Sequence, residues 1–259
     1  MDVTQNWQNY RSMVNDKPAI FAVNLTLLEQ YTAGEGKYTK ILQFSLPYHA
    51  EDNGLPLPEA YQSLLNEIVK VSALLCTLPA VLYAGYIISA QRAKLHFYCN
   101  QAAPLLAVLQ QFPTITEINE QDDPLWDIYF DFLLPSPLEI KINATEEVLD
   151  MLVHNGRNLA EIYLIEHSFH FPQEDDMYHF LDYVTSNDIA FTTLKHTNLP
   201  IALDEEENVY LVKLEQELAL DDGEIFAYVE KFENMAIQFS GEYVGWESQD
   251  AALDKNRLN

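Results

Sequence analysis

Basic residues are the scarcest charged class in this chain. Its 259 residues include 14 lysines and arginines against 40 aspartates and glutamates, which gives a formal net charge of −26. Direct binding of nucleic acid needs clustered Lys and Arg against the phosphates, so this charge argues against it. A basic protein partner fits better, although an acidic surplus can also serve only to keep a protein soluble.

Cysteine and glycine are also rare. Cys76 and Cys99 are the two cysteines, and they form neither a disulfide framework nor a CxxC metal site, which indicates a reducing compartment. Eight glycines leave no phosphate-binding loop of the GxxxxGK or GxGxxG kind. No apolar run approaches the roughly 18 residues of a membrane span, and the N-terminus lacks an apolar leader segment. We therefore expect a cytoplasmic protein that binds no nucleotide.

The sequence gives no support for catalysis. His96 and Cys99 lie three residues apart on a predicted strand and so face opposite sides of it. No Gly-x-Ser-x-Gly elbow is present, and no carboxylate pair stands out as acid and base among the 40 acidic residues. We predict no catalytic residue, no cofactor and no enzymatic activity.

Four of the seven histidines cluster between His167 and His196, close to several acids, which raises the question of a metal site. On a strand, neighbouring side chains alternate between faces, so His167 and His170 cannot share one ion. A site built from His170, Glu166 and an acid of the following helix is the remaining alternative. We predict that no metal is bound.

The expected order of elements is β-α-β-β-α-β in each half of the chain. The first set comprises strands at 38–46, 81–89, 94–99 and 114–119, with helices from 58 and at 104–111. The second comprises strands at 162–171, 189–194, 209–214 and 242–246, with helices at 174–186 and 222–238. This order is typical of the ferredoxin-like, split-βαβ fold.

Additional segments precede each set. A strand pair is expected at 7–13 and 19–25, and a strand at 125–134 is expected to precede a helix at 145–155. Pro135, Ser136 and Pro137 break the pattern and indicate a connector. We predict an α+β protein of two tandem ferredoxin-like α/β sandwich domains with antiparallel sheets, which comprise residues 1–142 and 143–259.

Two short motifs in the C-terminal half are the most specific features. One motif lies in the strand expected at 162–171 and contains Ile165, Glu166 and His167. The other is residues 241–247, with the sequence Gly-Glu-Tyr-Val-Gly-Trp-Glu. Together they resemble the bacterial protein inhibitor of ribonuclease E called regulator of ribonuclease activity B. In that family an Ile-Glu-His strand and a Glu-Tyr-Asp-Gly-Trp ending bracket one small domain, so Val244 here replaces an Asp. The resemblance covers roughly residues 145–250.

This resemblance implies a domain that acts by binding ribonuclease E, without catalysis of its own. An exposed Trp on an acidic rim is also typical of a protein-binding hot spot. For His167 and Tyr243, a buried structural role is the alternative to partner contact. The predicted partner-binding residues are Glu166, His167, Glu242, Tyr243, Trp246 and Glu247.

The N-terminal half is similar to a domain of unknown function that is fused ahead of this regulator-like domain in bacterial proteins. The residues that carry the likeness are Trp7, Tyr10, the turn at 53–56, Tyr83, Gly85 and the segment 123–129. No activity comes with this resemblance.

Three hypotheses about function follow. The leading one is a non-enzymatic acidic interaction module that binds a basic RNA-processing partner of ribonuclease E type. A small-molecule sensor or an unrecognised enzyme is the alternative, with an N-terminal pocket lined by Tyr83, Tyr86, His96 and Tyr98. In the third, the N-terminal domain forms a homo-oligomer through an exposed sheet edge.

Overall fold

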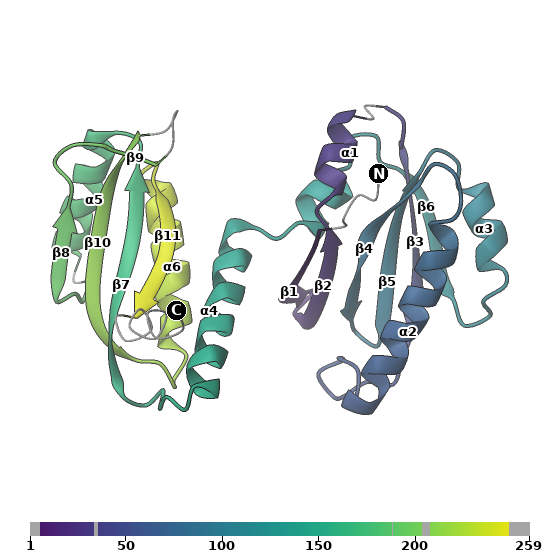
Figure 1. Ribbon diagram of the computed structural model, residues 1–259, viewed down its shortest axis with the longest axis horizontal. Helices are drawn as coiled ribbons and strands as arrows, with labels where there is room; N and C mark the ends of the chain where they lie inside the picture. Colours follow the sequence, from purple (N-terminus) through teal and green to yellow (C-terminus); the bar gives the residue numbers. More distant parts are fainter. Residues whose placement is uncertain (1–5, 34–35, 188, 204–207, 249–259) are drawn as a thin grey trace, which may run out of the picture. The chain divides into compact units, whose positions relative to one another are not determined.

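The computed structural model describes residues 6–33, 36–187, 189–203 and 208–248. The chain divides into two compact units, Met1–Glu139 and Ile140–Asn259. Each unit has its own antiparallel sheet and its own core (Figure 1). The predicted α+β class with two sandwich domains is thereby confirmed.

The first unit contains a sheet of six strands in the order β1-β2-β4-β5-β3-β6. Its strands are β1 (Trp7–Val14), β2 (Lys17–Asn24), β3 (Lys40–Pro47), β4 (Val81–Ser89), β5 (Arg92–Cys99) and β6 (Thr116–Asp122). Its helices are α1 (Leu27–Ala33), α2 (Pro58–Leu75), α3 (Ala103–Leu109) and η1 (Ile128–Leu133). The βαββαβ set runs from β3 to β6, and the β1–β2 hairpin extends its sheet beyond β4.

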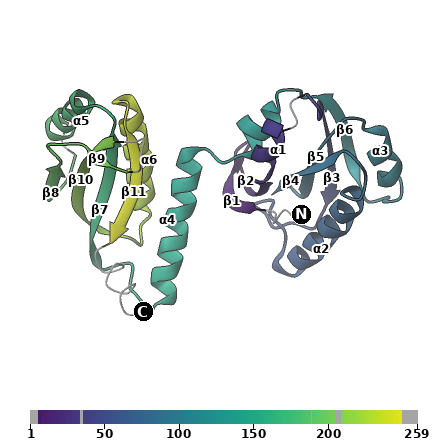
Figure 2. The same ribbon diagram turned by 45° about the horizontal axis from the view of Figure 1, so that its top comes forward.

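Both faces of the first sheet carry apolar cores. Helices α2 and α3 cover one face, where Ile68 and Leu105 pack with Phe44 and Phe97 in one cluster (Figure 2). Helices α1 and η1 contribute to a second cluster on the other face, in which Tyr129 takes part. Successive side chains of a strand point to opposite faces, so neighbouring apolar residues of these strands belong to different cores.

The segment 125–134, which we predicted to be a strand, instead contains the helix η1. Asp123 stabilises its start, because the Asp123 carboxylate accepts hydrogen bonds from the backbone N–H groups of Asp127 (2.8 Å) and Ile128 (3.2 Å). The first N–H groups of a helix have no partner within the helix, so such a carboxylate favours helix formation here. The strand prediction was wrong because it considered apolar content and not this cap.

The helix predicted at 145–155 is longer and begins at Pro137, as α4 (Pro137–His154). Ser136 Oγ accepts the backbone N–H of Glu139 at 3.2 Å, and Glu139 Oε2 accepts the backbone N–H of Ser136 at 2.8 Å. This reciprocal pair is a capping box, and proline is favoured at the first helical position after it. The residues that we read as a connector are therefore a helix start.

The second unit has a sheet in the order β11-β7-β10-β8. Its strands are β7 (Ile162–Phe171), β8 (Thr193–His196), β9 (Ile201–Ala202), β10 (Asn208–Ala219) and β11 (Glu242–Ser248). Besides most of α4, it contains α5 (Glu174–Ser186) and α6 (Glu224–Gln238). The strand predicted at 189–194 lies at Thr193–His196, and β10 continues beyond the predicted 209–214. The four βαββαβ strands lie in the order β4-β5-β3-β6 in the first sheet and β8-β10-β7-β11 in the second. Counted along the chain, this is the same order in both: second, third, first and fourth strand.

Strand β7 shows how the second sheet is covered. Every second residue, from Tyr163 to Phe171, is buried, and the residues between them are half-buried. Phe169 packs against Phe180 of α5 and Phe232 of α6, while Ile165 shares a cluster with Leu152 of α4. Because all three helices contact the same alternate residues, they cover one face, and no helix in the described part of this unit covers the other (Figures 1 and 2).

No helix among the described residues is long and apolar enough to cross a membrane.

Candidate functional site

Three glutamates lie side by side across the uncovered face of the second sheet. Glu247 of β11 is directly opposite Glu166 of β7, which is directly opposite Glu215 of β10. Opposed residues on antiparallel strands have Cβ atoms only about 4.5–5.5 Å apart, and like charges in such positions destabilise a sheet. This glutamate row therefore requires positive charge nearby.

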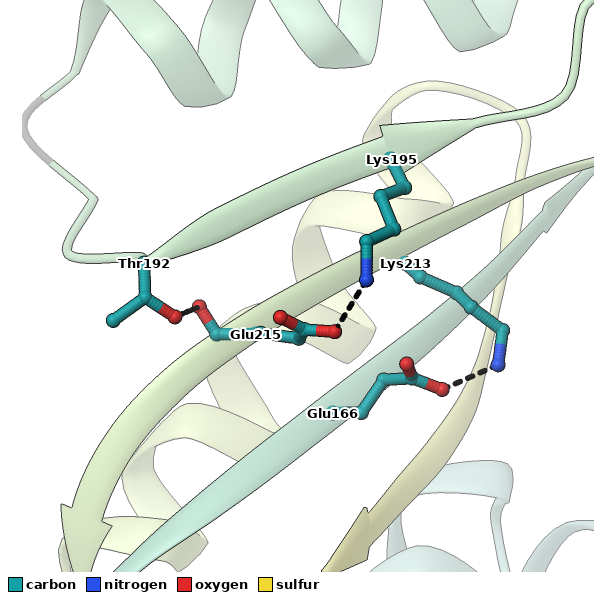
Figure 3. Close-up of polar contacts among 5 residues, drawn as sticks. All are labelled: Glu166, Thr192, Lys195, Lys213 and Glu215. Atoms are coloured by element: carbon teal, nitrogen blue, oxygen red, sulfur yellow. Dashed lines mark hydrogen bonds and ion pairs between the residues drawn. The ribbon is translucent and has the colours of Figure 1, made fainter. Parts of the chain in front are cut away.

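Two lysines supply part of that charge. Lys213 of β10 forms an ion pair with Glu166, and Lys195 of β8 pairs with Glu215 at 2.7 Å (Figure 3). The hydrogen bond from Lys195 holds the pKa of the Glu215 carboxyl below its usual value, and the same bond raises the pKa of Lys195. Glu247 has no ion-pair partner among the described residues, so one end of the row is uncompensated.

Further carboxylates lie on the same face. Glu217 of β10 and Glu242 of β11 are exposed and, within the described chain, take part in no ion pair. We call the whole set the glutamate face: Glu166, Glu215, Glu217, Glu242 and Glu247, with Lys195 and Lys213. A sheet face with a negative surplus of this kind favours the approach of cations.

The other predicted site residues point to the opposite side of the sheet. His167 and Tyr243 are buried, and His167 Nδ1 lies 2.8 Å from the Tyr243 hydroxyl in a hydrogen bond. Burial lowers the pKa of His167 to about 3, so its ring is neutral at physiological pH, and burial raises the pKa of Tyr243. Trp246 is half-buried, and its indole Nε1 donates to Thr145 Oγ1 of α4 at 2.9 Å.

The six predicted residues therefore do not form one surface. Glu166, Glu242 and Glu247 lie on the glutamate face, whereas His167, Tyr243 and Trp246 lie on the helix side. Sequence reasoning missed Glu215, Lys195 and Lys213. The alternation of apolar and charged residues along 212–215 is a signal for a strand with one polar face, but it does not say which residues are neighbours across strands.

The described residues contain no group of His, Cys, Asp and Glu side chains that could hold a metal ion. A cavity of about 140 Å³ lies beside Trp246, with Lys141, Thr145 and Tyr243 also in its lining. It is smaller than the roughly 300 Å³ at which small-molecule sites begin.

The N-terminal pocket that we considered as an alternative is not assembled as predicted. Tyr83 packs on the α2 side of the first sheet, where it stacks on Phe97 with ring centroids 4.6 Å apart. Tyr98 belongs to the core on the other face, where it stacks on Trp126. His96 alternates with Phe97 along β5 and so lies on the Tyr98 side. Tyr83 and Tyr86 line a groove against α2, but His96 and Tyr98 do not reach it.

The two units define a class of protein: tandem βαββαβ sandwiches, the second of which leaves a charged sheet face uncovered. The chain belongs to the family of unknown function DUF695, whose model matches residues 5–134, half of its length. Residues 142–248 match the family described as Regulator of ribonuclease activity B. Both resemblances expected from the sequence are confirmed.

The comparison with curated proteins gives no match. Among solved structures, the crystal structure of an unknown protein from Galdieria sulphuraria aligns with 82% of this chain and 98% of that chain at 8% identity. Its TM-score of 0.23 is too low to support any argument.

Proposed function

We propose that this protein is a non-enzymatic regulator whose C-terminal domain, predicted as residues 143–259, binds a basic segment of an RNA-processing protein of ribonuclease E type. The match to Regulator of ribonuclease activity B supports a regulatory role for this unit. The observation that carries the proposal is the glutamate row, because three opposed carboxylates share only two lysines.

A cationic side chain of the partner would complete the row at Glu247. The guanidinium group of Arg suits this position, because its fork of N–H donors matches a carboxylate and it is less strongly hydrated than an ammonium group. Glu242 lies on the same strand and has no ion pair within the described residues, so it adds a second acceptor nearby. The ammonium groups of Lys195 and Lys213 would repel the partner's cations from β8 and β10. This repulsion would set the position of the partner along the sheet.

We assign the helix-side residues a positioning role in this proposal. The His167–Tyr243 hydrogen bond joins β7 to β11, and the Trp246–Thr145 hydrogen bond joins β11 to α4. Between them the register of β11 shifts at a bulge that lies between Tyr243 and Gly245. Fixing β11 on both sides of this bulge would hold the carboxylates of Glu242 and Glu247 in place for the partner.

Binding of the full-length chain to purified ribonuclease E, followed by surface plasmon resonance at low and moderate salt, tests the proposal. A Glu242→Lys, Glu247→Lys double variant should bind about tenfold more weakly or worse, because it repels a basic partner. The matched control is Asp182→Lys, Glu230→Lys, which makes the same charge change at exposed positions of α5 and α6.

The control should keep wild-type affinity to within about twofold. Equal weakening of both double variants would show that net charge, and not the glutamate face, governs binding. Absence of binding by the wild-type chain would show that ribonuclease E is not the partner.

A further inference from the structure

We propose that the first unit contains a binding site for a small organic anion, in a cavity between its two tight hairpin turns. This cavity has a volume of about 360 Å³. The β1–β2 turn lines it at Asn15 and the β4–β5 turn lines it at Ala90. The turns are neighbours because β2 pairs with β4 up to Ala19 opposite Ser89. We call this space the basic cavity.

Positive charge is concentrated in the basic cavity. Lys17, Arg92 and Lys94 line it, and they are three of the seven lysines and arginines in residues 1–139, a stretch that also holds fifteen acidic residues. Arg92 and Lys94 are two residues apart on β5 and therefore point to the same face. In a unit with an acidic surplus, this local reversal of sign indicates an anionic ligand.

Among the described residues, Arg92 alone of these cations has an ion-pair partner. Glu117 also lines the cavity, but its carboxylate is engaged by Arg92 and by the Ser45 hydroxyl, which donates at 2.9 Å. These two bonds hold the pKa of Glu117 below its usual value, so it stays ionised beside Arg92. Lys17 and Lys94 have no ion pair with any described residue. The charge of Lys94 also helps to lower the pKa of Glu117, but less than the two bonds do, so both ammonium groups can contact a ligand.

Both turns that line the basic cavity have two residues with positive φ, as a type I′ hairpin turn requires. Asn15, Ala90 and Glu117 have φ of 50°, 49° and 53°, a left-handed region that is unfavourable for Ala and Glu. The β4–β5 turn is supported from behind, because the Gln91 backbone N–H donates to Gly54 O at 3.0 Å. This contact fixes the β4–β5 turn, at which Ala90 lines the cavity.

The remaining lining defines the class of ligand. Val14, Ile87 and Phe132 present apolar surface beside the cations. A carboxylate or phosphate could pair with Lys17 and Lys94 while an attached apolar group packs against Phe132. The volume is close to the lower limit of about 300 Å³ for small-molecule sites, which favours a compact ligand. This site lies in the first unit and does not depend on the glutamate face.

Isothermal titration of the full-length chain with four probes tests the inference: benzoate, phenyl phosphate, benzyl alcohol and inorganic phosphate. Benzoate or phenyl phosphate should bind, and their ratio distinguishes a carboxylate site from a phosphate site. Benzyl alcohol lacks the charge and inorganic phosphate lacks the apolar group, so both should bind at least about tenfold more weakly.

A Lys17→Ala, Lys94→Ala variant should weaken binding of the preferred anion by about tenfold or more. These lysines have no ion pair within the described residues, so their removal should not unfold the unit, which circular dichroism checks. Lys70→Ala, at an exposed position of α2, is the matched control and should bind as the wild type does.

Three results would overturn the inference. They are failure of both aromatic anions to bind at millimolar concentration, equal binding of inorganic phosphate, and unchanged affinity in the double lysine variant. None of them would affect the proposed function of the second unit, because that function is measured with a protein partner and with other variants.

Discussion

The imidazole of His167 and the hydroxyl of Tyr243 form a hydrogen bond of 2.8 Å inside the core of the second unit. Both side chains are fully buried, and the His167 ring packs edge-on against Phe232 with centroids 4.7 Å apart. His167 Nε2 has no hydrogen-bond partner among the described residues. Within the described residues, the bond to Tyr243 is therefore the one hydrogen bond of the His167 ring.

Removal of the Tyr243 hydroxyl should destabilise the second unit. In a Tyr243→Phe variant the ring volume stays the same, but His167 loses its polar partner in a buried position. We expect the free energy of unfolding to fall by about 1–3 kcal/mol, measured by urea denaturation. Tyr210→Phe, at a half-buried tyrosine for which no side-chain hydrogen bond is recorded, should change it by less than about 0.5 kcal/mol. Equal losses in the two variants would contradict the role of the buried bond.

His167 should also make stability depend on pH. Burial lowers its pKa to about 3, whereas in the unfolded chain the pKa is about 6.5, so between these values the unfolded state binds more protons. The contribution of neutral His167 to the free energy of unfolding is therefore largest well above pH 6.5, and it decreases as the pH falls from 6.5 toward 3. At pH 5 the loss from this one residue is about 2 kcal/mol.

Urea denaturation at several pH values between 7.5 and 5 measures this dependence. In a His167→Gln variant, the slope of the second unit's unfolding free energy against pH should be smaller by about 1.4 kcal/mol per pH unit in the lower part of this range. His96 of the first unit provides an internal comparison, because burial lowers its pKa to about 3 as well and its contribution should persist. An unchanged slope would show that His167 is not kept neutral by the fold.

Several elements could be predicted from the sequence because local signals agree there. The limits of β7 and α5 match the expected 162–171 and 174–186. In β7, aromatic and β-branched residues are frequent, which is typical of a strand, and in α5 three acids occupy the first turn, where the helix dipole favours them. The order of elements along the chain, βαββαβ in each unit, was recognised from the sequence, whereas the place of β1 and β2 in the first sheet was not.

The candidate site could be predicted only in part, because it depends on register. Glu166, Glu242 and Glu247 were identified, but Glu215 and its partner Lys195 were not. Opposition of Glu215 to Glu166 is a property of how β10 pairs with β7, and a shift by one residue would turn every side chain to the other face. The register between β10 and β7 depends on contacts between segments far apart in the chain, so it could not be predicted from the residues of either strand alone. Trp246, which we expected to be partly exposed, is half-buried, and its hydrogen bond to Thr145 of α4 could not be foreseen from the sequence.

The capping box at the start of α4 gives a prediction for the segment that we misread. In a Ser136→Ala variant, the backbone N–H of Glu139 loses its acceptor and the Glu139 carboxylate loses a donor hydroxyl. We expect a loss of about 0.5–2 kcal/mol and faster hydrogen exchange in the first turn of α4. Ser63→Ala, at an exposed position inside α2, should have little effect. Unchanged exchange at Ser136→Ala would contradict the cap.

Gly85 offers the sharpest test of the first sheet. It lies at the bulge in β4 with φ of 148°, and a Cβ atom there would be 2.2 Å from the backbone oxygen of Ala22. Because that oxygen belongs to the adjacent strand β2, it cannot move aside without disrupting the pairing of β2 with β4. Gly85→Ala should therefore lower the free energy of unfolding by more than about 3 kcal/mol, or abolish soluble expression.

A Gly36→Ala variant shows what an added Cβ costs at a glycine with positive φ but no close contact. Gly36 also has a positive φ, of 75°, but no atom of the described residues lies within 4 Å of an added Cβ. We expect a loss of about 1 kcal/mol there, from the left-handed backbone only. Thermal unfolding followed by circular dichroism measures both variants, and the difference between them combines the contact with Ala22 and the greater backbone strain at φ of 148°. If the two variants lost the same stability, β2 and β4 would not approach each other as closely at Gly85 as the structure shows.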